Sequence, residues 1–305
     1  MKSEIAMSIR SMTEADLPVC LSFTQQVKWP HRLIDWQLHF ELGNGSVIEA
    51  NLDSDNALSA PQIVGCILWW DYPALNTNTT ASSSTSSLSC ATVGLVVVPD
   101  AMQGRGLGRT LMNTVMAQTG ERNLQLVATV AGKRLYEQCG FTVRSTIYQV
   151  QGELATKPEV SDDIEISEVD AGSLSAVIEL DNQAFRADRS ALLKALMARG
   201  RCVIAKQNGK ALGYAFIRES GRGETIGPVV ASDSGVAKAL AAALLQQAKA
   251  FVRFDLTEHA SDLKGWLTDL GLQQVDEVSL MVKGEWLAQQ ASDSQVYSLA
   301  SQAFG

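Results

Sequence analysis

Gln103-Gly104-Arg105-Gly106-Leu107-Gly108 is the stretch that decides how this 305-residue chain is interpreted. It follows an apolar strand pattern over residues 90–98 and comes directly before an amphipathic helical pattern. The first backbone N–H groups of a helix have no intrahelical partner, and the helix dipole adds partial positive charge, so this turn favours a phosphate. The glycines let the backbone approach such a ligand, and Arg105 and Arg109 can add charge-assisted hydrogen bonds.

The spacing of the glycines separates the phosphate-binding folds from one another. The dinucleotide fingerprint G-x-G-x-x-G needs a third glycine where Arg109 stands. The P-loop needs a lysine directly after its last glycine, and none follows here. The pattern that remains, Q-x-x-G-x-G, resembles the turn with which the GNAT acetyltransferases bind the pyrophosphate of acetyl-CoA.

A second motif, Arg134-Leu135-Tyr136-Glu137-Gln138-Cys139-Gly140-Phe141, resembles the L-Y-E-x-x-G-F segment of the same family. Its apolar residues have helical spacing, Gly140 is a helix-ending residue, and Phe141 begins the next strand pattern. The resemblance implies that Tyr136 protonates the departing CoA thiolate. Read from the residues alone, without the two motifs together, Tyr136 is a core aromatic whose hydroxyl has a partner.

The resemblance also implies where acetyl-CoA binds. The implied cofactor-binding residues come from the end of a strand, the glycine turn and the following strand end: Val96, Val97, Val98, Gln103, Gly104, Arg105, Gly106, Leu107, Gly108, Arg109 and Thr129. In the family, the fourth and fifth strands separate and expose backbone groups to the pantetheine, and a backbone N–H near Val96 stabilises the oxyanion. The apolar run Leu95–Val98 fits an ordinary central strand equally well. Thr129 and Gly132 depart from the asparagine and alanine that many members carry.

The acceptor side is expected in the segment Lys28–Trp36, where such enzymes place acceptor-binding helices. His31 can titrate near neutral pH, and Asp35 can act as a base through a water molecule. The alternative is a helix that starts at Pro30, with Asp35 in solvent and Trp36 in the core. Trp29 and Trp70 are candidate substrate contacts. Trp69 and Trp70 are neighbours on one strand pattern, so their rings face opposite sides, and a core role for both remains open.

Two domains are expected from the order of elements. Residues 1–152 form the catalytic GNAT domain, residues 153–163 a polar linker, and residues 164–305 a second, degenerate GNAT-like domain. In the second half Ser232–Ala237 replaces the glycine turn, and Leu267 stands opposite Tyr136, so we expect no CoA binding and no chemistry there. The predicted fold class is α+β: tandem domains, each with a mixed, mostly antiparallel central sheet flanked by helices. The Asn/Thr/Ser-rich residues 76–89 are predicted to form a mobile loop.

Composition limits the remaining possibilities. The net charge of −8 and the pI near 5.0 argue against nucleic acid as a partner. No apolar run reaches the length of a membrane span, and the first residues lead into a strand pattern rather than a signal peptide. The five scattered cysteines have neither the spacing of a zinc site nor the density of a disulfide framework, so no metal is expected. We therefore expect a cytoplasmic protein, monomeric or homodimeric, without a membrane partner.

The leading hypothesis is an acetyl-CoA-dependent N-acetyltransferase in which a small amine attacks the acetyl group directly in a ternary complex. The alternative is a non-catalytic acyl-CoA-binding sensor or scaffold. A Rossmann-type oxidoreductase is a third possibility, and it would have to bind NAD(P).

Overall fold

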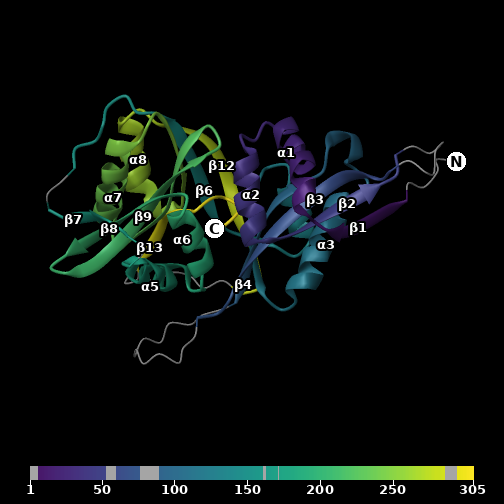
Figure 1. Cartoon of the computed structure of the whole chain (residues 1–305), viewed down its shortest axis with the longest axis horizontal. Coiled ribbons are helices and arrows are strands. Elements are labelled where there is room, and N and C mark those ends of the chain that lie inside the picture. Colours follow the sequence, from purple (N-terminus) through teal and green to yellow (C-terminus); the bar gives the residue numbers. More distant parts are fainter. Residues whose placement is uncertain (1–5, 53–59, 76–88, 161–162, 171, 286–293) are drawn as a thin grey trace.

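The computed structural model describes residues 6–52, 60–75, 89–160, 163–170, 172–285 and 294–305 (Figure 1). The loop expected over residues 76–89 falls on 76–88, which lie outside the described residues. In the described part of the chain, no helix is both long and apolar enough to cross a membrane.

Both halves of the chain contain strands and helices in a similar order. The first half contains β1 (Met7–Ser11), a 3-10 turn (Glu14–Asp16), α1 (Leu17–Gln26), α2 (Leu33–Leu42), β2 (Asn44–Ala50), β3 (Gln62–Tyr72), β4 (Cys90–Val97), a second 3-10 turn (Asp100–Met102), α3 (Leu107–Thr119), β5 (Asn123–Ala128), α4 (Lys133–Gln138) and β6 (Thr142–Glu153). The second half contains β7 (Glu165–Glu168), α5 (Leu174–Phe185), α6 (Ser190–Met197), β8 (Gly200–Gln207), β9 (Lys210–Ser220), β10 (Gly223–Ala231), α7 (Ser234–Gln247), β11 (Phe251–Leu256), a 3-10 turn (Glu258–Ala260), α8 (Ser261–Asp269), β12 (Gln273–Lys283) and β13 (Gln295–Ser298).

Within the described residues, all thirteen strands join one continuous sheet in the order β1-β2-β3-β4-β5-β12-β6-β11-β13-β10-β9-β8-β7. Most neighbours are antiparallel, and the β4–β5 and β10–β11 pairs are parallel. Together with the flanking helices this confirms the predicted α+β class with a mixed, mostly antiparallel sheet.

The two halves exchange strands where they meet. β12 of the second half pairs with β5 and with β6, both from the first half, and β6 pairs in turn with β11 of the second half. Each half therefore contributes one strand to the sheet of the other. Because backbone hydrogen bonds run without a break across this junction, the halves are fixed to each other by the sheet itself.

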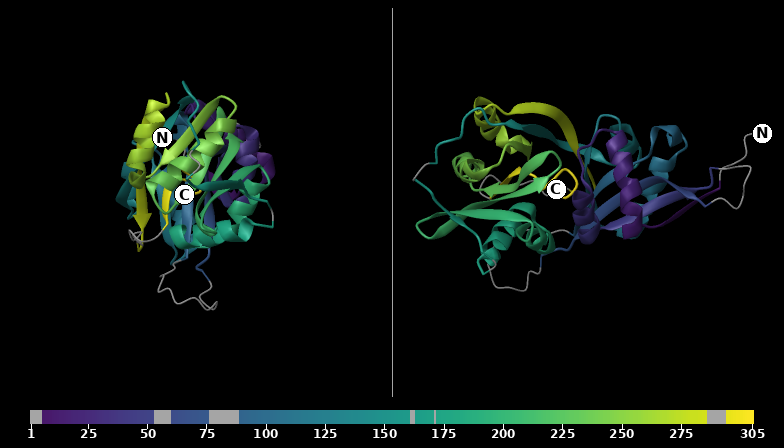
Figure 2. Two further views of the ribbon diagram at one scale, coloured as in Figure 1. Left: turned by 90° about the vertical axis from the view of Figure 1, so that its left-hand side faces the viewer. Right: turned by 45° about the horizontal axis from the view of Figure 1, so that its top comes forward.

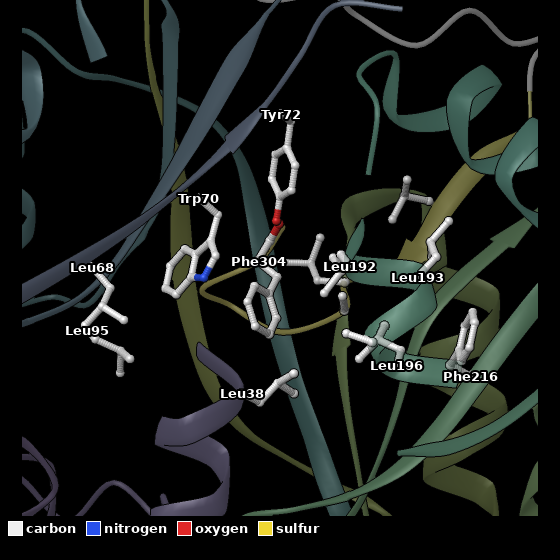
Figure 3. Close-up of a cluster of buried hydrophobic side chains, with 14 of the residues drawn as sticks. Leu38, Leu68, Trp70, Tyr72, Leu95, Leu192, Leu193, Leu196, Phe216 and Phe304 are labelled. Atoms are coloured by element: carbon white, nitrogen blue, oxygen red, sulfur yellow. The ribbon is translucent and has the colours of Figure 1, made fainter. Parts of the chain in front are cut away.

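Three apolar cores lie on the faces of the sheet. One packs under α3 and α4, and a second packs under α7 and α8. The third spans both halves and lies among α1, α2, α5 and α6. Figure 3 shows its centre, where Trp70 and Tyr72 of β3 face Leu192 and Leu196 of α6, with Phe304 between them. The shared core buries large apolar side chains from both halves, which gives a second reason for their fixed arrangement.

The C-terminal segment of the described chain lies between the two halves (Figures 1 and 2). The Tyr72 hydroxyl donates a hydrogen bond to the carbonyl of Phe304 at 3.0 Å. The guanidinium of Arg189 donates to the carbonyl of Gly305 at 2.7 Å and forms a fully buried ion pair with Asp181 at 2.6 Å. Side chains from both halves thus hold this segment in the junction.

Candidate functional site

The glycine turn has the backbone geometry that its sequence predicts. Gly104 and Gly106 have φ values of 74° and 79°, and a Cβ added at either residue would meet nothing within 4 Å. Gly106 is the N-cap of α3 and supplies no side-chain hydrogen bond to the helix. Among the described residues, the start of α3 thus has no side-chain cap, and the turn is open around Gly104 and Gly106, which is the arrangement an anion needs.

Side chains around the turn hold it against the sheet, and two arginine side chains of the turn are exposed. The Gln103 amide donates hydrogen bonds to the Val98 carbonyl at 3.1 Å and to the Asp100 carboxylate at 2.9 Å. Arg105 and Arg109 are exposed, and Arg109 donates to the Gln138 side chain at 2.6 Å. The turn thus combines open N–H groups with two accessible guanidinium groups.

β4 carries a bulge directly before this turn. Gly94 pairs with Leu68 and Val97 pairs with Cys66, so two residues of β4 oppose one residue of β3, and Leu95 has a φ of 52°. The parallel ladder between β4 and β5 ends at Val93 and Leu126, whereas β5 goes on to pair with β12 as far as Ala128. From Gly94 to Val97 the described pairings give β4 no partner on the β5 side, so backbone groups of this edge are available to a ligand.

Tyr136 of α4 packs on the α3 side of the sheet. Its side chain is buried, and its ring lies edge-on to Phe141 with 6.2 Å between centroids. A Cβ at Gly132 would lie 2.9 Å from the Tyr136 ring, so the position of this ring favours glycine at residue 132. Thr129 Oγ1 accepts a hydrogen bond from Gly132 N at 3.3 Å at the start of the same helix. Burial raises the pKa of Tyr136, so its hydroxyl keeps its proton at neutral pH.

A cavity of about 300 Å³ lies between the two halves. Its walls come from the segment before α2, from the separated ends of β4 and β5, from the second half and from the C-terminal segment. Its lining includes Trp29, His31, His39, Gly94, Leu95, Val127, Thr129, Arg218, Gly221, Arg253, Asp255 and Gln302. The volume lies at the lower end of the range for small-molecule pockets, roughly 300–1,000 Å³.

His31 and His39 are two neighbouring imidazoles in the cavity wall, with 6.1 Å between ring centroids. Burial lowers the pKa of His31 to about 4, although the Asp35 carboxylate opposes this shift. Burial also lowers the pKa of His39 well below its usual value. Among the described residues, neither Nδ1 atom has a hydrogen-bond partner. Both rings are therefore uncharged at neutral pH and can accept a proton.

Asp35 lies outside the cavity lining, beside His31. Its carboxylate accepts hydrogen bonds from Arg32 N at 2.8 Å, from the Arg32 guanidinium at 3.0 and 3.1 Å, and from Gly221 N at 3.1 Å. Burial opposes ionisation of Asp35, but these hydrogen bonds outweigh it and lower its pKa. Because Asp35 reaches back to Arg32, α2 begins at Leu33 and not at Pro30 as expected. The expected alternative of Asp35 in solvent is wrong, since Asp35 is buried.

The four tryptophans considered above have different surroundings, and Trp69 is buried in the core under α3 and α4. Trp29 lines the cavity. Trp70 is buried behind the cavity wall, where its Nε1 donates to the His39 carbonyl at 2.9 Å and its ring packs against Phe304 at 5.0 Å. Trp36 is fully buried. Trp70 thus supports His39 from behind, whereas Trp29 faces the space that a ligand would fill.

At the start of α7, the corresponding place in the second half, the structure has an acidic N-cap where α3 has the glycine turn. Asp233 is the N-cap of α7, and its carboxylate accepts a hydrogen bond from Val236 N at 3.0 Å. The position of a bound phosphate is therefore taken by a carboxylate of the protein itself. Leu267, opposite Tyr136 in the repeat, is fully buried.

The cavity lining also contains His39 and Arg218, which are not among the residues that the sequence predicts for the site. His39 has helical spacing with the apolar residues of α2, so nothing local distinguishes it from a core residue. Arg218 did carry a signal, because it is a charged residue that follows the apolar run Tyr214–Ile217 within one strand. The burial of Arg218 depends on the C-terminal segment that covers it, so the local sequence does not predict it.

Comparisons with known proteins agree with this geometry. Residues 51–143 and residues 177–298 each match a family model described as an acetyltransferase (GNAT) domain. An uncharacterized N-acetyltransferase, YitH, of Bacillus subtilis (strain 168) is 28% identical over 216 residues, which cover 70% of this chain and 76% of that protein.

Solved structures resemble the whole chain in fold. A protein from Pyrococcus horikoshii, described as a candidate acetyltransferase, superposes with a TM-score of 0.73 at 20% identity, over 100% of this chain and 99% of that one. A tandem GNAT protein from the clavulanic acid biosynthesis pathway superposes with a TM-score of 0.59 at 14% identity, over 93% and 100% of the two chains. These likenesses concern the fold.

Proposed function

Because this chain is a tandem-domain acyltransferase of the GNAT acetyltransferase family, we propose that it transfers the acetyl group of acetyl-CoA to a small amine. The amine attacks the acetyl group directly while both substrates are bound. The observation that carries this proposal is the course of β4: Gly94 and Leu95, at its bulge, line the cavity, and the same strand ends at Val97, six residues before the glycine turn begins at Gln103. One strand therefore connects a phosphate-binding turn with an acceptor cavity.

The residues present fit acetyl-CoA. The open N–H groups at the start of α3, with Arg105 and Arg109, are suited to the pyrophosphate. The free edge of β4 over Val96 and Val97 is suited to the amide groups of the pantetheine. Acetyl-CoA supplies the acetyl group as a thioester. Gln103, Gly104, Gly106, Leu107 and Gly108 would form the turn itself, with Val98 leading into it and Thr129 at the far strand end.

His31 is our proposed general base. Its uncharged imidazole lies in the cavity wall and has an unpartnered Nδ1 among the described residues. The carboxylate of Asp35 raises the pKa of His31 against the effect of burial, so it stabilises the imidazolium that forms when His31 takes the proton of the amine. We therefore assign Asp35 an electrostatic supporting role. Trp29 would contact the acceptor, and Trp70 would act indirectly by holding His39.

Two further groups complete the proposed mechanism. A backbone N–H of the bulged β4 edge near Val96 stabilises the negative charge on the acetyl oxygen. The Tyr136 hydroxyl, which burial keeps protonated, donates a proton to the departing sulfur.

Acetyl-CoA turnover against a library of small amines tests the proposal. We expect Tyr136→Phe to lower kcat by roughly 100-fold, in the range for loss of a general acid, while the Kd for acetyl-CoA stays unchanged. If acetyl-CoA binds tightly and no amine in the library is acetylated, the sensor or scaffold hypothesis replaces the enzyme. If Tyr136→Phe retains full kcat, the assignment of Tyr136 is wrong.

A further inference from the structure

Arg218 places a buried positive charge in the acceptor cavity. Its side chain is 5% exposed and lines the cavity from β9. Nη2 donates a hydrogen bond to the Ala300 carbonyl at 3.0 Å. Nε and Nη1 are buried and have no hydrogen-bond partner in the part of the chain that the structure describes. Buried guanidinium donors without acceptors are rare in folded proteins, so we expect a ligand to accept hydrogen bonds from this group.

The carboxylates of the protein near Arg218 are already engaged. Asp255 accepts a hydrogen bond from Arg253 at 2.8 Å and another from the Gln302 amide at 3.0 Å. Arg218 also borders a second pocket, but there Asp35 is held by Arg32 and Gly221, and Glu224 accepts from Lys249 N at 2.7 Å. None of these groups forms an ion pair with Arg218 among the described residues.

The charge of the cavity is positive although the whole chain carries a net charge of −8. Its cationic lining residues are Lys28, Arg218, Arg222 and Arg253, and its acidic ones are Asp255 and Asp276. Burial lowers the pKa of Arg218 to about 10, which leaves it charged at neutral pH. His31 and His39 add no charge there, because burial lowers both of their pKa values.

We propose that the acceptor is an amino acid or a closely related amino-carboxylate, whose carboxylate is bound by the free N–H groups of Arg218 while its amine faces His31 and the β4 edge. One unpaired guanidinium matches the single negative charge of a carboxylate better than the charge of about −2 on a phosphate monoester. The cavity of about 300 Å³ has the size of a small ligand. This inference rests on the proposed acetyltransferase function and specifies its substrate class.

The test compares matched acceptors on the full-length protein. Acetyl-CoA turnover is measured with the standard L-amino acids, with their amides, and with the amines obtained by decarboxylation. For wild type we expect the amino acid to exceed its amide and its amine in kcat/KM by roughly 10- to 150-fold, the factor for one charge-assisted hydrogen bond. Arg218→Met should remove this preference by raising KM for the amino acid alone. Arg218→Lys should restore part of it.

Arg201→Met is the matched control, since it makes the same change on neighbouring β8, outside the cavity lining. It should leave the preference intact. Thermal unfolding of each variant shows whether Arg218→Met is folded, and calorimetric titration of the preferred amino acid without acetyl-CoA gives a readout that needs no turnover. Binding that Arg218→Met weakens and Arg201→Met does not supports the inference.

Failure of the inference is distinct from failure of the proposed function. Acetylation of decarboxylated amines as efficient as that of the amino acids would overturn the amino-carboxylate assignment and leave the acetyltransferase in place. An equal loss of kcat/KM for all three acceptor types in Arg218→Met would also overturn the assignment, because such a loss would show that Arg218 has a structural role. Absence of turnover with every acceptor, together with calorimetric binding of an amino acid that depends on Arg218, would overturn the enzyme and retain the ligand class.

Discussion

Asp35 of the first half accepts a hydrogen bond from the backbone N–H of Gly221 in the second half, with 3.1 Å between Gly221 N and Asp35 Oδ2. The same carboxylate caps α2 through Arg32 N and pairs with the Arg32 guanidinium at 3.0 Å. One buried side chain thus fixes the start of a helix, joins the two halves and places a negative charge beside His31. Gly221 and His31 both line the cavity, so this contact forms part of the frame around the acceptor.

Asp35→Asn should lower the free energy of unfolding by about 1–2 kcal/mol, because a charge-assisted hydrogen bond to Arg32 becomes a weaker neutral one. It should also lower the pKa of His31 further, since the carboxylate that favours the imidazolium is gone. Urea unfolding measures the first effect and histidine NMR titration the second. Asp71→Asn is the control, because Asp71 makes a more exposed contact with Arg122 at 3.5 Å and its loss should change stability little. An unchanged His31 titration in Asp35→Asn would exclude the supporting role.

Stability should fall as the pH drops from about 6.5 towards 4. His31 has an ordinary pKa of 6.5 in the unfolded chain and about 4 in the folded protein, so the unfolded state binds more protons in this window. The contribution of His31 to the free energy of unfolding is therefore fully present above pH 6.5. It is lost as the pH falls, by up to about 3 kcal/mol at pH 4. Burial of His39 acts in the same direction. The free energy of unfolding, measured with a chemical denaturant at several pH values, should depend less steeply on pH in His31→Asn than in wild type. The control His259→Asn changes an exposed histidine and should show the same pH dependence as wild type. Equal slopes for all three proteins would contradict this prediction.

Gly106→Ala should weaken acetyl-CoA binding and lower stability by about 1 kcal/mol. A φ of 79° is unfavourable for any residue with a Cβ, and the new methyl group would stand in the open space above the turn. Gly120→Ala is the matched control: Gly120 has a φ of 59°, meets nothing within 4 Å and lies at the other end of α3. Calorimetry should find weaker acetyl-CoA binding only in Gly106→Ala. Similar binding by both variants would argue against the turn as the phosphate site.

Asp233→Ala should cost about 1 kcal/mol of stability, because α7 loses the side chain that caps its first turn. It should leave acetyl-CoA affinity and turnover unchanged, and titration should give one bound acetyl-CoA per chain before and after the substitution. A second binding event in the wild-type protein would contradict the proposal that the second half binds no cofactor.

Local sequence patterns determined much of the fold because their physical causes are local. The glycines of the turn and the periodicity behind them predict a helix start, and α3 begins at Leu107. The motif around Tyr136 predicts a short helix that ends before Phe141, and α4 ends at Gln138. The resemblance carried by these two motifs identified the family, and the match of both halves to acetyltransferase domains confirms it.

The tertiary structure alone decided how the two halves are combined. A strand pattern specifies which face of the strand is buried but not which strand lies beside it. Residues 142–153 and 273–283 therefore do not indicate that β6 and β12 are exchanged between the halves. The same holds for the acceptor cavity. His39, Arg218 and Gln302 are far apart in sequence and meet only because the shared sheet and the C-terminal segment bring them together. The sequence by itself determined the elements and the cofactor motifs, since these depend on neighbouring residues. The acceptor site depends on contacts between distant residues, and only the folded chain contains them.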